Sequence, residues 1–487
     1  MDVDVWGAGF NGFKQISEQY RHGSVVSEPQ MIQTTCCILN ITLSWSQLAL
    51  IDGNGKIITS PFKAEKNETL KSGENQHNEH FTCRSLTCLN DQILALLSDG
   101  SVQILTESHS MKTVKYTERD VNQRNDVDNK HQTSPASSVK SIHGTDKELF
   151  FLEVSGTLSS CILTHLDTET WIMSPLMPVL CAEPIVSVSC GKEHVLLLGK
   201  NRQIYSFGGG SRGQLGHGDV VSRKQPQLLE ALAGVAFTSV AAGGWHSVAL
   251  SDIGDVWVWG WNESGQLGLP CGGSNKKLLM DMSIDSANTD TGESTDGEKS
   301  GVQKTFTSNL NSEPIKDSSS AINIHDSDEN QSAQRTHTDP ISETSSNTTA
   351  NSIGSPSPHS KPLDSMESHV YVQNCDVSHV QVQSEPCGLD LLDVTATQIS
   401  CGSRHTALLT GSGVVLTCGW NKYGQLCHGD TLNRDFLQSV NLFVKEKLKV
   451  TDIYCGQWNT IIITENKRHA INVDTRETLS HGCLSSH

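Results

Sequence analysis

The sequence lacks an excess of positive charge. Its 36 lysines and arginines stand against 54 aspartates and glutamates, so the 487-residue chain carries a formal net charge of −18. A protein that tracks DNA or RNA needs a basic surface to neutralise phosphates, and docking on anionic lipid needs one too. The composition therefore argues against direct nucleic-acid binding and against attachment to a membrane.

Long apolar runs and paired cysteines are also missing. No stretch approaches the ~20 apolar residues that span a bilayer, and the N-terminal "MDVDVWGAGFNGF" has neither the basic nor the apolar region of a secretory signal. The 15 cysteines include no Cys-x-x-Cys pair, which argues against a zinc ribbon or a disulfide scaffold. We expect a soluble intracellular protein whose cysteines are small buried residues.

The sequence also holds no recognisable set of catalytic residues. It has no P-loop, no nucleophile elbow and no pair of zinc ligands. A loose glycine-rich match, "GGGSRG", precedes no helical pattern and belongs to a repeated segment. We therefore predict a protein that is not an enzyme and that binds no cofactor and no metal.

What the sequence does contain is a repeat with a period near 50 residues. Gly191 and Gly243 open two copies that lie 52 positions apart, and Gly402 and Gly456 open two more that lie 54 apart. In three copies a histidine follows this glycine by three positions, and Gly-Gln-Leu comes further on. These histidines are His194, His246 and His405. Such a period in short strands indicates a propeller.

Each copy has a strand–turn–strand outline. "SVALS" and "DVWVWG" are short, rich in β-branched and aromatic residues, and separated by the turn residues 252–254. Weaker copies upstream have turns at Gly55, Gly100 and Gly156, and they bring the number of repeats to about seven.

The last copy stops early, and the start of the chain resembles its missing half. In "VDVWGAGF", Trp6-Gly7 matches Trp259-Gly260 of a complete copy. A strand that completes the last blade would close the ring and remove two exposed sheet edges. We therefore predict an all-β, monomeric, seven-bladed β-propeller closed by the N-terminal strand.

An acidic segment interrupts the repeats. Residues 271–370 hold 7 basic residues, 15 acidic residues and a single aromatic one, so they cannot bury enough apolar surface to offset the entropy of ordering. We predict a disordered Ser/Thr-rich insert over 269–370 that loops out between blades five and six. Residues 1–268 then form blades one to five, residues 371–470 form blades six and seven, and 471–487 form a tail.

The residues that recur at matching offsets are interpreted as structural. A catalytic base is needed once per site, whereas the histidine recurs, so we expect it to hydrogen-bond backbone at the blade edge near the central channel. Gly210, Asn262 and Asn421 exchange at one offset, which indicates a left-handed turn position. The other structural glycines are Gly208, Gly260 and Gly419, which end a predicted strand, and Gly213, Gly265 and Gly424, which we expect to approach the next blade.

Residues that differ between copies are better candidates for function. Trp245 and Trp458 share an offset with Arg404, while Trp261 and Trp420 stand where other copies have glycine or alanine. Exposed tryptophan and arginine are typical anchors of protein interfaces. These five residues are our candidates for binding a partner; packing of the rings between blades is the other interpretation, and the sequence favours it.

The pattern "CGxxHxxxL…WGxNxxGQLGHGD" resembles the repeat of the regulator of chromosome condensation family over residues 186–268 and 397–465. The resemblance implies a seven-bladed propeller of four-stranded blades. It also implies a short, propeller-only adaptor of the nucleus, and also of the cytoplasm, that partners a JmjC-domain demethylase or oxygenase. Such an adaptor would meet chromatin indirectly and support histone methylation control, transcriptional repression and chromosome segregation in mitosis.

The founding member of that family exchanges guanine nucleotides on the Ran GTPase and has a basic N-terminal tail that touches DNA. Here Met1-Asp2-Val3-Asp4 leads directly into a predicted strand, so the resemblance does not extend to direct DNA binding. Exchange activity on a small Ran-like GTPase is the alternative function.

Overall fold

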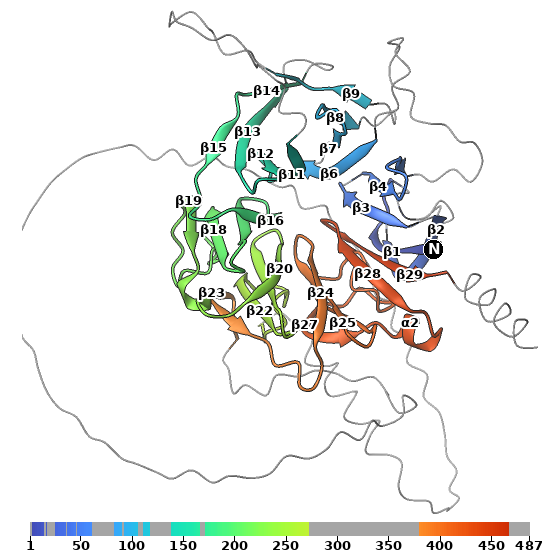
Figure 1. Ribbon diagram of the computed structural model, residues 1–487. Coiled ribbons are helices and arrows are strands. Elements are labelled where there is room, and N and C mark those ends of the chain that lie inside the picture. The colour runs from blue at the N-terminus through green and yellow to red at the C-terminus, as the bar shows by residue number, and fades with distance from the viewer. Residues whose placement is uncertain are drawn as a thin grey trace, which may run out of the picture. The chain divides into compact units, whose positions relative to one another are not determined.

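The computed structural model describes residues 2–13, 16, 25–35, 37–44, 46–60, 82–89, 92–105, 111–116, 138–165, 171–271 and 379–466. Their strands form seven sheets arranged in a ring, which confirms the predicted all-β, seven-bladed propeller (Figure 1). The predicted tail over 471–487, and the predicted insert apart from residues 269–271, lie outside the described residues. No helix in the described part of the chain is long and apolar enough to cross a membrane.

Blades 1 and 3 depart from a regular four-stranded sheet, whereas blade 2 has one. Blade 1 has β3 (Ile38–Leu43), β4 (Leu48–Asp52) and β5 (Ile57–Thr59), and blade 2 has β6 (Cys83–Leu89), β7 (Gln92–Leu97), β8 (Val102–Leu105) and β9 (Met111–Thr113). Blade 3 has β11 (Val139–Gly144), β12 (Glu148–Glu153) and β13 (Leu158–His165), whose outer edge pairs with β14 (Trp171–Met173) and β15 (Met177–Val179); β10 (Lys115–Tyr116) pairs with β14.

Blades 4 to 6 repeat one four-stranded pattern. Blade 4 has β16 (Ile185–Cys190), β17 (His194–Gly199), β18 (Ile204–Gly208) and β19 (Arg223–Leu228), followed by the short helix η2 (Glu230–Leu232). Blade 5 has β20 (Phe237–Ala242), β21 (His246–Ser251), β22 (Val256–Trp261) and β23 (Val382–Gly388). Blade 6 has β24 (Ala396–Cys401), β25 (His405–Thr410), β26 (Val415–Gly419) and β27 (Arg434–Ser439), followed by α2 (Asn441–Lys445).

Blade 7 joins the two ends of the described chain. Its inner strands β28 (Val450–Cys455) and β29 (Asn459–Glu465) are followed outward by β1 (Val3–Phe10) and β2 (Val25–Thr35). The predicted closure by the N-terminus is confirmed, with two N-terminal strands rather than one.

The register of β1 corrects one detail of the sequence comparison. Gly9 lies opposite Asn459, just as Gly260 lies opposite His246. Gly9 is therefore the counterpart of Gly260, and the match of Trp6-Gly7 to Trp259-Gly260 was wrong by two positions. A shift of two keeps every side chain on the same face of a strand, so the apolar pattern alone does not reveal it.

The predicted position of the insert is also corrected. The outermost strand of blade 5, β23, pairs with β22 but follows residues 272–378 in the chain. The insertion thus falls inside blade 5, between its third and fourth strands, and not between blades five and six. The sequence concealed this because "VQSEPCG" is short and has no fully buried residue, as suits a strand at the rim.

The hydrophobic core is divided among the seven junctions between blades. Each junction holds its own cluster of buried side chains, drawn from the two blades that it joins. The second strands β17, β21 and β25 are buried along their whole length because a neighbouring blade covers each face. This explains why "HVLLLG" reads as a continuous apolar run and not as an alternating one.

Candidate protein-interaction face

The repeated histidines join neighbouring blades through a hydroxyl group. His246 Nε2 lies 3.0 Å from Oγ1 of Thr406 in blade 6, and that hydroxyl donates to the carbonyl oxygen of Gln266 in blade 5 at 2.6 Å. The same arrangement links blade 4 to blade 5 and blade 6 to blade 7. The members of these two relays are His194, Ser247 and Gln214, and His405, Thr460 and Gln425.

The relay fixes the protonation of the ring. A hydroxyl has one hydrogen, and here it goes to the glutamine carbonyl, so the histidine Nε2 must carry a proton and donate. Burial lowers the pKa of His246 to about 3 and that of His405 to about 4, which keeps both rings neutral. The sequence expectation of a bond to backbone was therefore wrong about the partner, because a hydroxyl on the next blade stands between ring and carbonyl.

The left-handed turn position was also misplaced. Among the described residues, Gly210, Asn262 and Asn421 do not have positive φ. The asparagines instead close the loop with their side chains: Asn262 Oδ1 accepts from Leu267 N at 3.0 Å, and Asn421 Oδ1 accepts from Leu426 N at 2.8 Å. Exchange of glycine and asparagine at this offset thus reflects a side-chain hydrogen bond in two of the copies and not backbone strain.

The glycines on either side of that position do have positive φ. Gly208, Gly260 and Gly419 have φ between 102° and 113°, and a Cβ there would meet the backbone of their own blade. Gly213, Gly265 and Gly424 lie against the outer strand of the next blade. A Cβ on Gly265 would lie 2.3 Å from Asp435 Cα, and one on Gly424 would lie 2.4 Å from Ser27 Cα.

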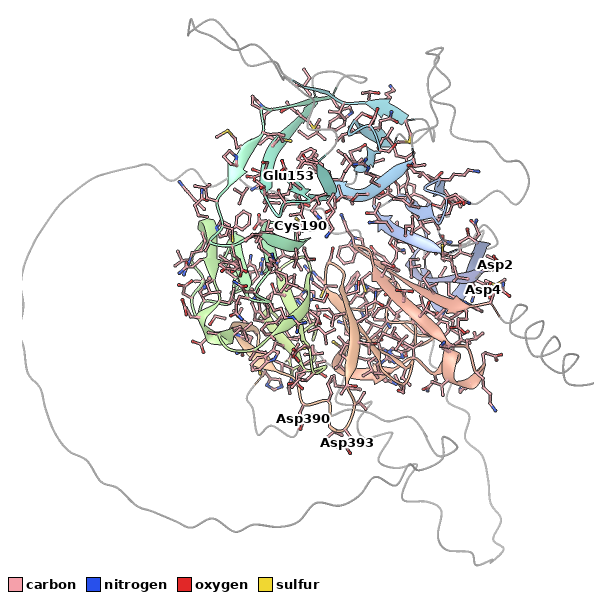
Figure 2. The ribbon with its side chains drawn as sticks, viewed as in Figure 1. Asp2, Asp4, Glu153, Cys190, Asp390 and Asp393 are labelled. Atoms are coloured by element: carbon pink, nitrogen blue, oxygen red, sulfur yellow. The ribbon has the colours of Figure 1, made fainter. Side chains whose placement is uncertain are left out.

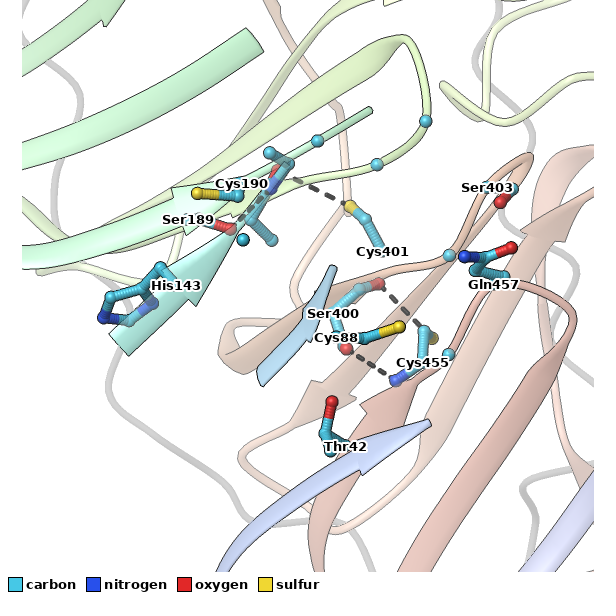
Figure 3. Close-up of a pocket in the computed structure, with 18 of the residues that line it drawn as sticks. Thr42, Cys88, His143, Ser189, Cys190, Ser400, Cys401, Ser403, Cys455 and Gln457 are labelled. Atoms are coloured by element: carbon cyan, nitrogen blue, oxygen red, sulfur yellow. Dashed lines mark hydrogen bonds between the residues drawn. The ribbon is translucent and has the colours of Figure 1, made fainter. Parts of the chain in front are cut away.

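A central channel of about 370 Å³ runs between the innermost strands (Figure 3). All seven blades contribute to its wall, through Thr42, Cys88, His143, Ser189, Ala241, Ser400 and Tyr454 among others. Cys401 and Cys455 also line it, and their thiols donate to the carbonyl oxygens of Ala241 and Ser400. Burial raises the pKa of Cys455 to about 12 and that of Cys401 well above its ordinary value.

Cys401 and Cys455 are therefore protonated thiols that hydrogen-bond to backbone, as small inner-strand residues would be. Figure 2 places Cys190 toward the centre of the ring, while Asp390 and Asp393 lie at its periphery on the loop between β23 and β24. Within the described ranges, no three His, Cys, Asp or Glu side chains are placed to hold a metal ion.

The residues that differ between copies occupy two equivalent positions in each of blades 4 to 7. One position directly precedes the second strand, and the other directly follows a glycine of positive φ near the end of the third. A backbone hydrogen bond of 2.6 to 3.0 Å joins the two. The pairs are Glu193 and Gly209, Trp245 and Trp261, Arg404 and Trp420, and Trp458 and Phe10. The same frame thus presents different side chains on one face of the propeller.

Three of the predicted residues meet in what we call the arginine–tryptophan cluster, formed by Lys192, Arg212, Trp245, Trp261 and Arg404. The two indoles pack edge to face with centroids 5.5 Å apart. The guanidinium carbons of Arg212 and Arg404 lie 4.2 and 4.5 Å from the Trp261 centroid, and Lys192 Nζ lies 5.2 Å from that of Trp245.

The other two predicted residues belong to an aromatic cluster, formed by Phe10, Phe13, Trp420, Tyr423 and Trp458. The rings of Trp420 and Trp458 are 4.9 Å apart, and Tyr423 lies 5.1 Å from Trp420 and 5.0 Å from Phe10. Phe13 is 53 % exposed. The two clusters are continuous, because Arg404 O accepts the backbone hydrogen bond of Trp420.

Both sequence interpretations of these residues describe part of the geometry. Trp261 is only 8 % exposed and packs between arginines from the two neighbouring blades. Trp245, Trp420, Trp458 and Arg404 are half-buried. Their role in binding a partner remains a prediction, while the clustering is a property of the fold.

Comparison with known proteins agrees with this architecture. The model of the regulator of chromosome condensation (RCC1) repeat matches residues 203–250 and 412–463, and a second model of that repeat matches 185–214, 237–266 and 396–425. The blades that contain these residues thus match the RCC1 repeat. Propellers of this family are in general non-catalytic.

Two relatives and one solved structure illustrate the likeness. RCC1 domain-containing protein 1 of Homo sapiens is 34% identical over 64% of this chain and 63% of its own length. The Mus musculus protein of the same name is 28% identical over 94% of this chain and 96% of its own. The crystal structure of Prp20p from Saccharomyces cerevisiae, described with its binding to Gsp1p and histones, has a TM-score of 0.55 at 12% identity, over 98% and 95% of the two chains.

Two members of the arginine–tryptophan cluster were missed from sequence. Lys192 and Arg212 lie in blade 4, 49 to 69 positions before Trp261, and their offsets carry no repeat-wide signal. Arg212 follows "GGGS" in a loop that reads as a plain turn. A sequence alone places neither residue beside the indoles, because the contact crosses from one blade to the next.

Proposed function

We propose that this chain is a non-enzymatic interaction scaffold that binds a JmjC-domain demethylase or oxygenase through the face formed by the two clusters. It acts in the nucleus, and also in the cytoplasm, as a monomer that meets chromatin through its partner. In that role it supports histone methylation control, transcriptional repression and chromosome segregation.

The observation that carries the proposal is the gathering of copy-specific side chains on one face. In blades 4 to 7 the backbone frame is the same, yet its two variable positions carry tryptophan, arginine or phenylalanine in three blades out of four. A rigid frame orders these anchors before binding, which lowers the entropic cost of association. Tryptophan and arginine are also the residues that most often dominate interface energies.

Similarity to RCC1 domain-containing protein 1 supports the RCC1-like propeller on which the proposed scaffold rests. The alignment with the mouse protein spans nearly the whole of both chains. We expect a JmjC-domain partner because the sequence of this chain resembles the short propeller-only member of the family.

Size-exclusion chromatography of the full chain with a purified JmjC-domain oxygenase tests the proposal. We expect a stable 1:1 complex that the variant Trp245→Ala/Trp458→Ala weakens by about 30-fold or more, since one interface hot spot is worth ~2 kcal/mol. Ile253→Ala is the matched control, because this exposed apolar residue lies in the turn at the opposite end of blade 5. Absence of a complex with the wild-type chain would refute the partner assignment.

Guanine-nucleotide exchange is the second candidate. It is favoured by the likeness to Prp20p over almost the whole chain, since that structure is described with its binding to Gsp1p. This function predicts that catalytic amounts of the chain accelerate nucleotide release from a small Ran-like GTPase. An unchanged release rate would dismiss it and leave the scaffold proposal intact.

A further inference from the structure

Trp261 lies between two positive charges that come from different blades. Arg212 of blade 4 and Arg404 of blade 6 both place their guanidinium groups within 4.5 Å of its ring centroid. Arg212 is also 5.4 Å from the Trp245 centroid. Each contact is a cation–π interaction, and the buried indole holds both arginines at defined positions.

The nearby carboxylates pair with Arg404 and Lys192 but not with Arg212. Glu263 lies 3.7 Å from Arg404 but is 58 % exposed, and Lys192 has Asp146 at 4.0 Å. Within the described part of the chain, Arg212 has no carboxylate at ion-pair distance. Burial has the largest effect on the pKa of Arg404 and lowers it. The carboxylate of Glu263 raises this pKa, and the positive charge of Arg212 lowers it. The two guanidinium groups therefore repel each other across the indole.

The arrangement selects for a negatively charged ligand. A cationic group such as a lysine side chain would meet rings whose faces already hold Lys192, Arg212 and Arg404. A carboxylate would relieve the repulsion and match the planar fork of a guanidinium group. Because the chain carries a net charge of −18, long-range electrostatics repel acidic molecules, so capture of one requires a local site.

Apolar side chains border the cluster on the blade 4 side. Val382 of β23 is 44 % exposed and lies by the turn that carries Arg212, since a Cβ on Gly213 would be 3.2 Å from its Cγ1. Val221 is 58 % exposed, and its carbonyl faces Gly210 in the same turn. The surface thus combines two fixed cations with exposed methyl groups.

We infer that the arginine–tryptophan cluster binds an acidic peptide segment of a protein partner, with a carboxylate on Arg212 and Arg404 and an apolar neighbour on Val382. The inference rests on the proposed function as an interaction scaffold and names the chemistry of what the scaffold binds. It does not depend on the partner being a JmjC oxygenase.

Selection from a random peptide display library on the immobilised full chain tests the inference. We expect enrichment of sequences that contain aspartate or glutamate next to an apolar residue. Synthetic peptides from the selection, labelled with fluorescein, should bind at least ten-fold more weakly to the variant Arg212→Gln/Arg404→Gln. Their affinity should also fall between 50 and 200 mM salt, because exposed ion pairs are screened.

The matched control is Lys200→Gln/Arg202→Gln. It also removes two positive charges, but at the β17–β18 turn, which lies at the opposite end of blade 4. Affinity for the control should equal that of the wild type. Should Arg404→Gln unfold the chain, Arg212→Gln alone serves as the test, because no carboxylate in the described ranges pairs with it.

Three results of the peptide experiments would overturn the inference. They are enrichment of peptides without acidic residues, retention of acidic peptides by the variant that lacks both arginines, and failure to enrich any peptide. Binding of a 20-base-pair DNA duplex that depends on the arginines, without peptide binding, would assign the site to phosphate and also overturn it. None of these results requires a JmjC protein, so the scaffold proposal is tested separately.

Discussion

Replacing Thr406 by valine removes one hydroxyl from the junction of blades 5 and 6 and leaves the shape of the side chain unchanged. That hydroxyl accepts from His246 Nε2 at 3.0 Å and donates to Gln266 O at 2.6 Å. All three residues are at most 1 % exposed, so water cannot replace the lost group. His246 Nε2–H is left without a partner, and Gln266 O keeps only the weak thiol donor Cys418 Sγ at 3.7 Å. A buried polar group that loses its partner costs about 1–3 kcal/mol.

We therefore expect Thr406→Val to lower the free energy of unfolding by about 2–5 kcal/mol in urea titrations. Thr406→Ser keeps the hydroxyl and gives blade 6 the residue that blade 5 has at Ser247; it should cost about 1 kcal/mol for the lost methyl group. Thr395→Val, at an exposed position just before β24, should stay within about 0.5 kcal/mol of the wild type. If the Thr406→Val and Thr406→Ser variants unfold alike, the hydroxyl relay does not hold the blades together.

Three further predictions concern the repeat and the channel. Because burial lowers the pKa of His246 to about 3, the unfolded chain binds more protons than the folded one below about pH 6.5, so the melting temperature should fall on acidification. The His246→Asn variant should show a shallower fall, and an equal slope would contradict the neutral ring. Gly265→Ala should lower the free energy of unfolding by about 3 kcal/mol or more, and Gly413→Ala by about 1 kcal/mol. Both glycines have φ near +80°, but only Gly265 lies against another backbone. Equal losses of unfolding free energy in urea titrations would exclude the close approach as the cause. Mass spectrometry after iodoacetamide treatment at pH 8 should find the exposed Cys37 alkylated and Cys401 intact, because burial raises the pKa of Cys401; comparable labelling would show that the channel admits the reagent.

The prediction of the fold from sequence rested on self-similarity. A segment that recurs about every 50 residues with the same strand and turn pattern has to form the same unit each time, and such units bury their apolar faces only against one another. The pattern in β17, β21 and β25 therefore identified the propeller before any coordinates. The degenerate blades 1 to 3 were recognised by outline because their turn glycines remain, as at Gly55 and Gly156.

The errors made from sequence share a cause. The counterpart of Gly260 in β1 was missed by two positions, and β23 was not recognised as part of blade 5. In both cases the strand pairs with a segment far away in the chain, and the pairing partner is what fixes register and membership of a sheet. The local periodicity of a strand carries no information about which distant segment it pairs with.

The sequence by itself determined which residues are structural and which are candidates for recognition, because recurrence at a fixed offset marks the former and departure from it marks the latter. Only the tertiary structure decided that Arg212 and Arg404 flank Trp261 and that a hydroxyl links each histidine to the next blade. Both contacts cross from one blade to its neighbour. Their geometry depends on how blades pack around the ring, which the order of residues within one repeat does not specify.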